Sequence, residues 1–243
     1  MNGRTLVIGD IHGALKALEQ VVERANVSAN DTLIFLGDYV DGWSDAPNVI
    51  NYLIQLKTTH NCIFIKGNHD ELCLKWLTKQ QHNPQWLIHG GQTTVDAYSS
   101  IEKGIIDLHI LFLEHLENYH IDSENRLYVH AGFTHERGVK NETFPKMFYW
   151  ERTLWEMALA MDKNLTKENV LYPKRLLNYN EIYIGHTSLT RIGISKPYKA
   201  ANVWNIDTGA AYKNPLTILN VDTKEFWQSD PVNELYPLEN GRN

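Results

Sequence analysis

The chain has 243 residues, of which 43% are hydrophobic and 21% charged, a composition typical of a soluble globular protein. A formal net charge of −6 argues against a general affinity for nucleic acids or anionic membranes, so neither is expected as a partner. Cys62 and Cys73 form no CxxC pair, and no stretch resembles a signal peptide or a membrane span. These features predict a cytoplasmic protein and leave its oligomeric state open.

The N-terminal half alternates between short apolar, β-branched runs and segments with apolar residues at helical spacing. The predicted elements are strands over residues 5–10, 31–38 and 62–70 and helices over residues 14–26, 47–57 and 71–79. This alternation of strand and helix is typical of a sheet covered by helices.

The rest of the chain is first helical and then returns to strands. Amphipathic patterns predict helices over residues 105–119 and 150–162. Further strands are predicted within residues 126–132, 181–187, 201–209 and 216–222. Strands in both halves suggest two packed sheets with helices outside. The stretch from about residue 229 is polar with two prolines and is expected to be a surface tail, and the whole chain, 1–243, is expected to form one domain.

Five predicted strands each run into a loop that carries side chains able to bind metal ions. In chain order these residues are Asp10 and His12, Asp38 and Asp41, Asn68 with His69 and Asp70, His130, and His186. Each one alone has an ordinary explanation, because a strand often ends in a "GD" turn and a lone histidine is more often a surface or core residue. Repetition at the carboxyl ends of strands, where reactive groups of sheet proteins gather, favours a functional site. Mixed carboxylates and imidazoles suit Mn, Fe or Zn.

The ordered motifs GDIHG, GDYVDG, GNHD, HAG and GHT resemble the calcineurin-like metallophosphoesterase superfamily, and more closely its phosphoprotein phosphatase type. The similarity extends to WLIHGG at 86–91, YWER at 149–152 and NIDTGA at 205–210. The chain resembles both bacterial and phage serine/threonine phosphatases and symmetrical diadenosine tetraphosphatases. The resemblance implies an α/β fold, a four-layer α/β/β/α sandwich of two mixed sheets flanked by helices.

The resemblance also implies two divalent metal ions per chain, with Mn²⁺ favoured over Fe or Zn. The implied ligands are Asp10, His12, Asp38, Asn68, His130 and His186. Asp10 and His12 would bind the first ion, and Asp38 would bridge both, because a carboxylate can offer its oxygens to two cations. A water held between the ions would lose a proton and attack the phosphorus as a metal-bridging hydroxide.

The remaining site residues follow from the same resemblance. His69 is implied as the general acid for the leaving group, and Asp41 would hold its ring by a hydrogen bond. Arg152, Asn68 and Lys66 are implied as ligands of the substrate phosphate. The expected reaction is hydrolysis of a phosphomonoester, so the partner would be a phosphoprotein or a small phosphate ester. The alternatives are a symmetrical dinucleoside polyphosphate hydrolase and a metal-loaded binding protein with weak turnover.

One motif departs from the phosphatase pattern. Gly42 stands where the pattern usually has an arginine that grips the substrate phosphate, and Lys66 offers a charge but no planar fork. The pocket is therefore expected to be wider and less cationic beside Gly42, with Arg152 as the main remaining clamp. Trp43 could stack on an aromatic part of the substrate or pack in the core, and packing is favoured because tryptophan is largely buried on average.

Overall fold

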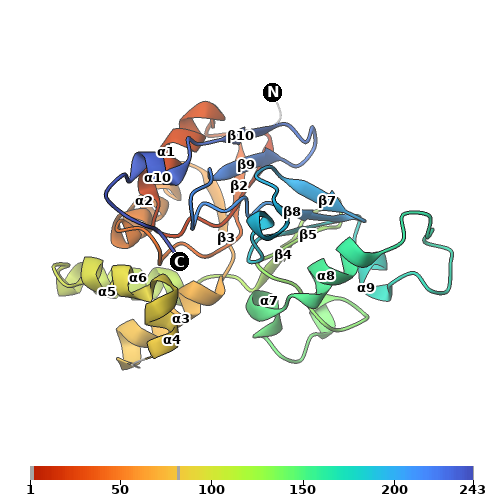
Figure 1. The fold of residues 1–243 in the computed structure, drawn as a ribbon, viewed down its shortest axis with the longest axis horizontal. Helices are drawn as coiled ribbons and strands as arrows, with labels where there is room; N and C mark the ends of the chain where they lie inside the picture. Colours follow the sequence, from red (N-terminus) through yellow and green to blue (C-terminus); the bar gives the residue numbers. More distant parts are fainter. Residues whose placement is uncertain (1–2, 81–82, 243) are drawn as a thin grey trace.

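Residues 3–80 and 83–242 are described by the computed structural model, whose strands form two five-stranded sheets (Figure 1). The strands are β1 Thr5–Ile8, β2 Thr32–Phe35, β3 Asn61–Phe64, β4 Tyr119–Ile121, β5 Arg126–Val129, β6 Glu181–Ile184, β7 Tyr198–Ala200, β8 Val203–Asn205, β9 Thr217–Asn220 and β10 Phe226–Gln228. The first sheet has the order β10-β9-β1-β2-β3 and the second the order β4-β5-β6-β8-β7. Both are mixed, because β1–β2–β3 and β5–β6–β8 pair in parallel whereas β4, β7, β9 and β10 pair antiparallel.

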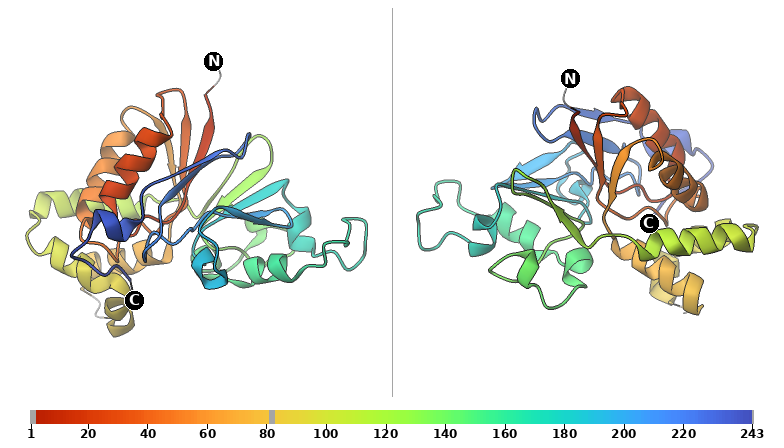
Figure 2. Two further views of the ribbon diagram at one scale, coloured as in Figure 1. Left: turned by 45° about the horizontal axis from the view of Figure 1, so that its top comes forward. Right: turned by 180° about the vertical axis from the view of Figure 1, so that it is seen from behind.

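The helices lie outside the two sheets. They are α1 Leu15–Arg24, α2 Ala46–Leu56, α3 Asn68–Lys79, α4 Pro84–Trp86, α5 Gln92–Tyr98, α6 Lys103–Glu114, α7 Met147–Trp150, α8 Thr153–Ala160, α9 Lys174–Leu177 and α10 Val232–Leu235, with short turns of other helix types at Leu87–Gly91, Val139–Asn141 and Leu189–Ile192. Figures 1 and 2 show α1, α2 and α10 on the outer side of the first sheet and α7, α8 and α9 on the outer side of the second. Within the described residues, no helix is long and apolar enough to cross a membrane.

Three clusters of buried apolar side chains separate the four layers. Val7 of the first sheet and Tyr128 and Tyr183 of the second meet between the sheets, where the two tyrosine rings stack at 5.1 Å. Leu6 belongs to the cluster under α1 and α2, and Leu127 to the cluster under α8, because successive side chains of a strand point to opposite faces. The protein is thus a four-layer α/β/β/α sandwich, which confirms the fold class predicted from the sequence.

The predicted elements are present with adjusted bounds. The strands β4, β7 and β10 were not predicted, nor were the helices α4, α5, α9 and α10. The helix predicted over 105–119 ends at Glu114, because the chain leaves α6 to pair with the end of β3, where the Glu117 amide donates to the Phe64 carbonyl at 2.8 Å. Helix α3 begins at Asn68, earlier than the predicted residue 71. Asn68 and His69 therefore lie on the first turn of a helix, which fixes their backbone.

The segment from about residue 229, expected to be a surface tail, is partly packed into the core. Val232 is fully buried and Tyr236 is 3% exposed. The ring of Tyr236 stacks on Trp43 at 5.3 Å, and Trp43 is itself buried and donates its indole N–H to the Ala210 carbonyl at 2.8 Å. The expectation of a surface tail is wrong because two apolar residues on a single helical turn are too few to give a periodic signal. The packing role favoured for Trp43 is confirmed.

Candidate active site

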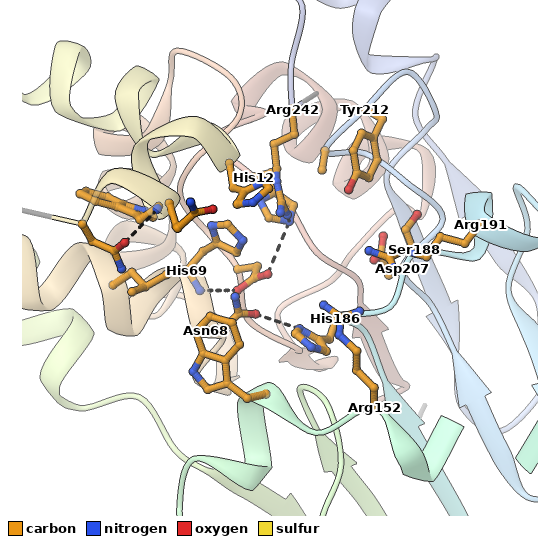
Figure 3. A pocket seen from close by; sticks show the side chains of 18 residues that line it. His12, Asn68, His69, Arg152, His186, Ser188, Arg191, Asp207, Tyr212 and Arg242 are labelled. Carbon is orange, nitrogen blue, oxygen red and sulfur yellow. Dashed lines mark hydrogen bonds and ion pairs between the residues drawn. The ribbon is translucent and has the colours of Figure 1, made fainter. Parts of the chain in front are cut away.

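A cavity of about 400 Å³ opens at the carboxyl ends of the parallel strands of both sheets (Figure 3). The predicted site residues that line it are His12, Asp38, Asn68, His69, Arg152 and His186. Asp10 and His130 are buried and contact this lining, since an Asp10 oxygen accepts the His186 amide at 2.9 Å and His130 Nε2 lies 3.2 Å from the Asn68 side-chain oxygen. Residues spread over 176 positions of sequence are thereby brought into one place.

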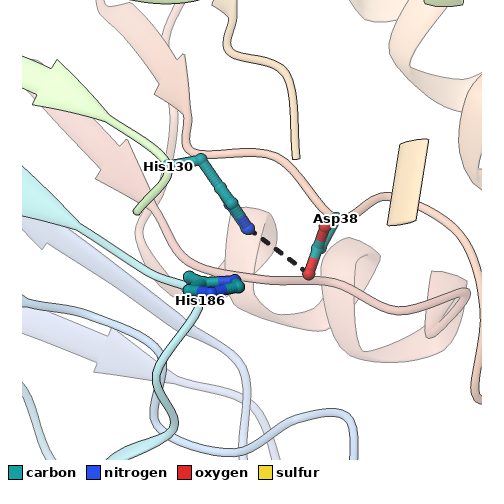
Figure 4. Close-up of side chains that lie close together, drawn as sticks. All are labelled: Asp38, His130 and His186. Carbon is teal, nitrogen blue, oxygen red and sulfur yellow. Dashed lines mark ion pairs between the residues drawn. The ribbon is translucent and has the colours of Figure 1, made fainter. Parts of the chain in front are cut away.

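Asp38 belongs to two groups of side chains that could each hold a metal ion. One group is Asp10, His12 and Asp38, and the other is Asp38, His130 and His186, with the ligand atoms of each group within 4.8 Å of one another. Figure 4 shows His130 and His186 approaching the Asp38 carboxylate from the second sheet. Two ions held by these groups would share the Asp38 carboxylate.

Two candidate ligand atoms of these groups lack, within the described part of the chain, the hydrogen-bond partners that buried polar atoms normally have. Asp10 Oδ1 and His186 Nε2 are buried without a hydrogen-bond partner among the described residues. Burial and the charge of Asp207 raise the pKa of Asp10, and burial is the main cause of the lowered pKa of His12 and His186. Buried carboxylates beside imidazoles that resist protonation need another source of positive charge, so these residues fit divalent cations.

Asp38 is the electrostatic centre of the cluster. Its Oδ2 lies 3.5 Å from Nε2 of both His12 and His130. Burial opposes the charge of Asp38, but His130, His69 and His12 outweigh burial and lower its pKa. Burial also disfavours charge on His130, yet Asp38 raises the pKa of that imidazole to about 9. The arrangement strongly favours a charged carboxylate at Asp38.

Sharp turns in the strand-end loops direct these side chains into the cavity. Four predicted site residues have a left-handed backbone, with φ of 52° at His12, 53° at Asp38, 71° at Asp41 and 63° at His186. Such conformations are uncommon for residues other than glycine and cluster at functional sites. Asp70 stabilises the Asp38 loop, because its carboxylate accepts the Asp38 amide at 2.8 Å.

His69 and Asp41 form the pair predicted from the sequence. His69 Nδ1 lies 2.5 Å from Asp41 Oδ2, and both side chains are buried. Asp41 also accepts hydrogen bonds from Trp86 Nε1 at 2.5 Å and from the Thr94 hydroxyl at 2.6 Å. With Asp41 fixed by three partners, the His69 ring has one orientation, and its Nε2 edge is available to the cavity that it lines.

Only one of the two predicted basic ligands of phosphate, Arg152 and Lys66, lines the cavity. Arg152 lines the cavity, and its Nη1 donates to the Thr187 hydroxyl at 3.2 Å. Burial and then the charge of Arg191 lower the pKa of Arg152, as expected for guanidinium groups that share one cavity. Lys66 is not part of the described lining, because its backbone follows β3 and its amide pairs with the Glu117 carbonyl at 2.7 Å. The structure therefore gives no support to the phosphate-binding role expected for Lys66.

The expectation of a wider, less cationic cavity beside Gly42 is wrong. Gly42 has φ of +96°, a conformation that favours glycine, and its amide donates to the Gly90 carbonyl at 3.1 Å. A Cβ placed on Gly42 would lie 3.2 Å from Cγ of Arg242 and 3.3 Å from the His12 carbonyl oxygen. The backbone requires glycine here, and the side chain of Arg242 fills the space beside it.

Among the lining residues that the sequence analysis missed are three with an acidic or guanidinium side chain: Arg191, Asp207 and Arg242. Asp207 lies in the NIDTGA stretch that was noticed but given no role, and Arg191 follows GHT by four residues. Arg242 had no such signal, because it lies in a polar stretch far from every strand-end motif. Only the packing of the C-terminal segment brings it to the cavity.

Comparisons with known proteins agree with this geometry. The model of the family described as "Calcineurin-like phosphoesterase" matches residues 3–231. The chain is 27% identical over 234 residues to the asymmetrical bis(5'-nucleosyl)-tetraphosphatase PrpE of Oceanobacillus iheyensis, covering 90% of this chain and 89% of the relative. It is 23% identical over 220 residues to serine/threonine-protein phosphatase 1 of Salmonella typhimurium, covering 88% and 90%.

A solved structure shows the same fold. The metallophosphoesterase from Sphaerobacter thermophilus superposes with a TM-score of 0.58 at 18% identity, covering 97% of this chain and 95% of that chain. The family uses a binuclear metal centre, for which the two groups that share Asp38 are the candidate ligands. The chain belongs to the calcineurin-like phosphoesterase family and is a metal-dependent phosphoric ester hydrolase.

Proposed function

We propose that the chain hydrolyses phosphomonoesters, including phosphoserine and phosphothreonine in proteins, at a site for two divalent ions, with Mn²⁺ favoured over Fe or Zn. The observation that carries the proposal is that Asp38 belongs to two groups of ligand atoms, and that two of these atoms, Asp10 Oδ1 and His186 Nε2, are buried without a hydrogen-bond partner among the described residues. When bound, the ions would supply a nucleophilic water by lowering its pKa and would draw charge from the phosphoryl oxygens. The side chains of the protein would hold the ions, transfer a proton to the leaving group and bind the phosphate.

The ligands are divided between the two sheets. Asp10 and His12 of the first sheet would hold the first ion together with Asp38. The second ion would be held by Asp38, by His130 and His186 of the second sheet, and by Asn68 after β3. The Asn68 side-chain oxygen lies 2.8 Å from His186 Nδ1, so an uncharged ligand stands among the imidazoles (Figure 3). A neutral amide limits the negative charge of the site, which helps an anionic phosphate to approach.

His69 would act as the general acid. With Nδ1 bound to Asp41, a proton on Nε2 points towards the cavity and can pass to the leaving oxygen as the ester bond breaks. Asp41 would be a positioning residue, because it holds His69 by a hydrogen bond and does not itself line the cavity. Arg152 would bind phosphoryl oxygens through its planar fork, and the Asn68 amide nitrogen would add a further donor.

A dinucleoside polyphosphate is the second candidate substrate. The observation in its favour is that three guanidinium groups reach the cavity, from Arg152, Arg191 and Arg242, which is more than one phosphoryl group needs. Trp150 also lines the cavity and is 41% exposed, which leaves part of its indole free to stack on a base. The similarity to PrpE supports this candidate and raises asymmetrical cleavage beside the symmetrical cleavage considered from the sequence.

A substrate panel tests the proposal. The Mn²⁺-loaded protein and a metal-free control would be given an aryl phosphate, a set of phosphopeptides and diadenosine tetraphosphate. Metal-dependent release of phosphate with the highest kcat/KM on a phosphopeptide supports the first proposal. A higher kcat/KM on the tetraphosphate supports the second, and the products distinguish two diphosphates from a triphosphate and a monophosphate. No turnover of any substrate by the metal-loaded protein would contradict both and favour a binding protein.

We also propose that the protein acts in the cytoplasm. Cys62 and Cys73 are free thiols, and Cys73 is fully buried. Burial raises the pKa of Cys62 to about 11 and also raises the pKa of Cys73. Protonated thiols without a disulfide suit a reducing compartment.

A further inference from the structure

We infer that Arg242, in the segment that follows α10, binds the phosphate of the substrate beside Gly42. This inference rests on the proposed function and adds a residue to the same site. It assigns substrate binding to a part of the chain that carries no phosphoesterase motif. The class of ligand is a phosphate ester, whose non-bridging oxygens accept two parallel hydrogen bonds from a guanidinium fork.

The Arg242 guanidinium reaches the ligand groups themselves. It lines the cavity, and its Nη1 lies 3.3 Å from Nε2 of His12 (Figure 3). The guanidinium carbon lies 5.8 Å from the centre of the Tyr212 ring, which also lines the cavity. The side chain therefore points into the cavity beside His12, a candidate metal ligand.

Among the described residues, Arg242 has no carboxylate partner that would explain this position. Its Nε is buried without a hydrogen-bond partner, and no carboxylate lies within 4.0 Å of its guanidinium, among residues 3–80 and 83–242. The Arg242 guanidinium instead contacts the ring nitrogen of His12, a candidate metal ligand. A guanidinium facing a pair of cations is repelled by them unless an anion lies between, so the arrangement becomes favourable when phosphate is bound.

The backbone around Arg242 is built to hold it there. Its amide donates to the Ala211 carbonyl at 2.8 Å, and the Glu239 carboxylate accepts the Ser44 amide at 3.0 Å and the Ser44 hydroxyl at 2.7 Å. These contacts, with the stacking of Tyr236 on Trp43, fasten the segment to the loop that carries Gly42.

Two glycines make room for the stem of Arg242. Gly90 has φ of +103°, and a Cβ on it would lie 2.9 Å from Cγ of Arg242 and 2.8 Å from the amide nitrogen of Gly42. A side chain at Gly42 would meet the same Cγ. The absence of a side chain at Gly42 and Gly90 therefore leaves the space that the stem of Arg242 occupies.

Phosphate affinity tests the inference without turnover. Inorganic phosphate would be titrated into the full Mn²⁺-loaded chain by calorimetry, for the wild type, Arg242→Ala, Arg242→Lys and the control Arg137→Ala. Arg137 is exposed and does not line the cavity, so its variant should bind phosphate within about twofold of the wild type. Loss of Arg242 removes hydrogen bonds to a charged group, so Arg242→Ala should raise the Kd by about 10–150-fold. Arg242→Lys should raise it by a smaller factor, because a charge remains without the fork.

Metal content and thermal unfolding of each variant complete the experiment. Unchanged metal content together with the weaker phosphate binding supports the inference. Phosphate binding by Arg242→Ala as tight as in the wild type would overturn it, and tighter binding would show that Arg242 blocks the site. Loss of metal from both Arg242 variants would also overturn it, because Arg242 would then support the ligand groups. If phosphate binding weakens as expected but no substrate is hydrolysed, the proposed function fails while the assignment of Arg242 stands.

Discussion

The two sides of the cavity are built in different ways. On the ligand side, Asp10, Asp38 and His130 are at most 2% exposed and lie in the loops immediately after β1, β2 and β5. On the guanidinium side, Arg152 and Arg242 are half-buried and Arg191 is exposed. Arg152 and Arg242 come from segments outside the strand-end loops, and Arg191 lies on the short helical turn Leu189–Ile192, beyond the GHT motif. The first side is held by sheet and core, whereas the second depends on how peripheral segments pack.

This difference separates two tasks. Ligands for metal ions must be held closely, because small displacements of ligand atoms weaken coordination and orientation. Guanidinium groups on long side chains tolerate larger shifts and can adapt to the shape of the substrate. We infer that the chemistry depends on the ligand side and that the choice of substrate depends on the guanidinium side, which suggests four measurements.

The largest effect is expected on the ligand side, at Asp38. Asp38→Asn removes the charge shared by both groups of ligand atoms, so both ions should be lost or bound weakly. Removing a residue that only orients a metal ligand weakens metal binding by about 10–100-fold, and the loss of metal affinity in Asp38→Asn should be larger than this. Elemental analysis after reconstitution and dialysis gives the metal content. Asp10→Asn is the matched variant and should mainly release one ion. Retention of both ions by Asp38→Asn would contradict the shared site.

The next effect concerns proton transfer by His69. General acid catalysis supplies about 10²–10⁴-fold, and most of this when the leaving group is a poor one. His69→Asn should therefore lose far more kcat/KM on an alkyl phosphate than on an activated aryl phosphate, while retaining its metal. Asp41→Asn should follow the same pattern, since Asp41 acts through His69. Equal losses on both phosphates would rule out the general-acid role.

On the guanidinium side, Arg152→Ala should have a smaller effect. Losing charge-assisted hydrogen bonds to a phosphate costs about 1.5–3 kcal/mol, or roughly 10–150-fold in binding. The expected result is a raised KM for every phosphate substrate with metal content unchanged. Steady-state kinetics beside Arg137→Ala would measure it. If Arg152→Ala loses metal and retains KM, the division between the two sides is wrong.

The smallest effect is expected at Asp31, a buried carboxylate outside the cavity. Unlike the carboxylates of the ligand side, Asp31 is paired with a guanidinium group. Arg4 Nη2 lies 2.7 Å from Asp31 Oδ2. Burial alone would raise the pKa of Asp31, but the hydrogen bonds from Arg4 and Ser28 lower it. The folded state thus favours the charged carboxyl, so its stabilisation is present above the unfolded pKa of about 3.9 and is lost as the pH falls below it.

Asp31→Asn should lower the free energy of unfolding at pH 7 by about 1–3 kcal/mol. The difference from the wild type should shrink as the pH falls below about 4. Chemical denaturation at several pH values measures it, with Asp230→Asn as a control, because the Arg24–Asp230 pair is largely exposed and should contribute less. A difference that is independent of pH would show that the charge of Asp31 does not matter.

The contrast between the two sides of the cavity explains which features could be predicted from the sequence. The strands before Asp10, Asp38, His130 and His186 were readable because apolar runs and the glycines after them are local signals. The short strands β4, β7 and β10 were not, because edge strands of three residues carry little pattern. The start of α3 was misplaced since Asn68 and His69 are poor helix formers that sit on its first turn.

The sequence by itself determined the fold class, the order of the strand-end loops and the chemical types gathered at their ends. Each of these features depends on residues within a few positions of one another. Their spacing is enough to indicate a strand, the turn after it and the ligand residues in that turn. Only the tertiary structure decided that Lys66 stays outside the cavity lining, that Tyr236 packs on Trp43, and that Arg242 occupies the space beside Gly42. Contacts between segments some 200 residues apart are set by complementary packing of whole layers, and no local pattern encodes which remote side chain will fill a given space.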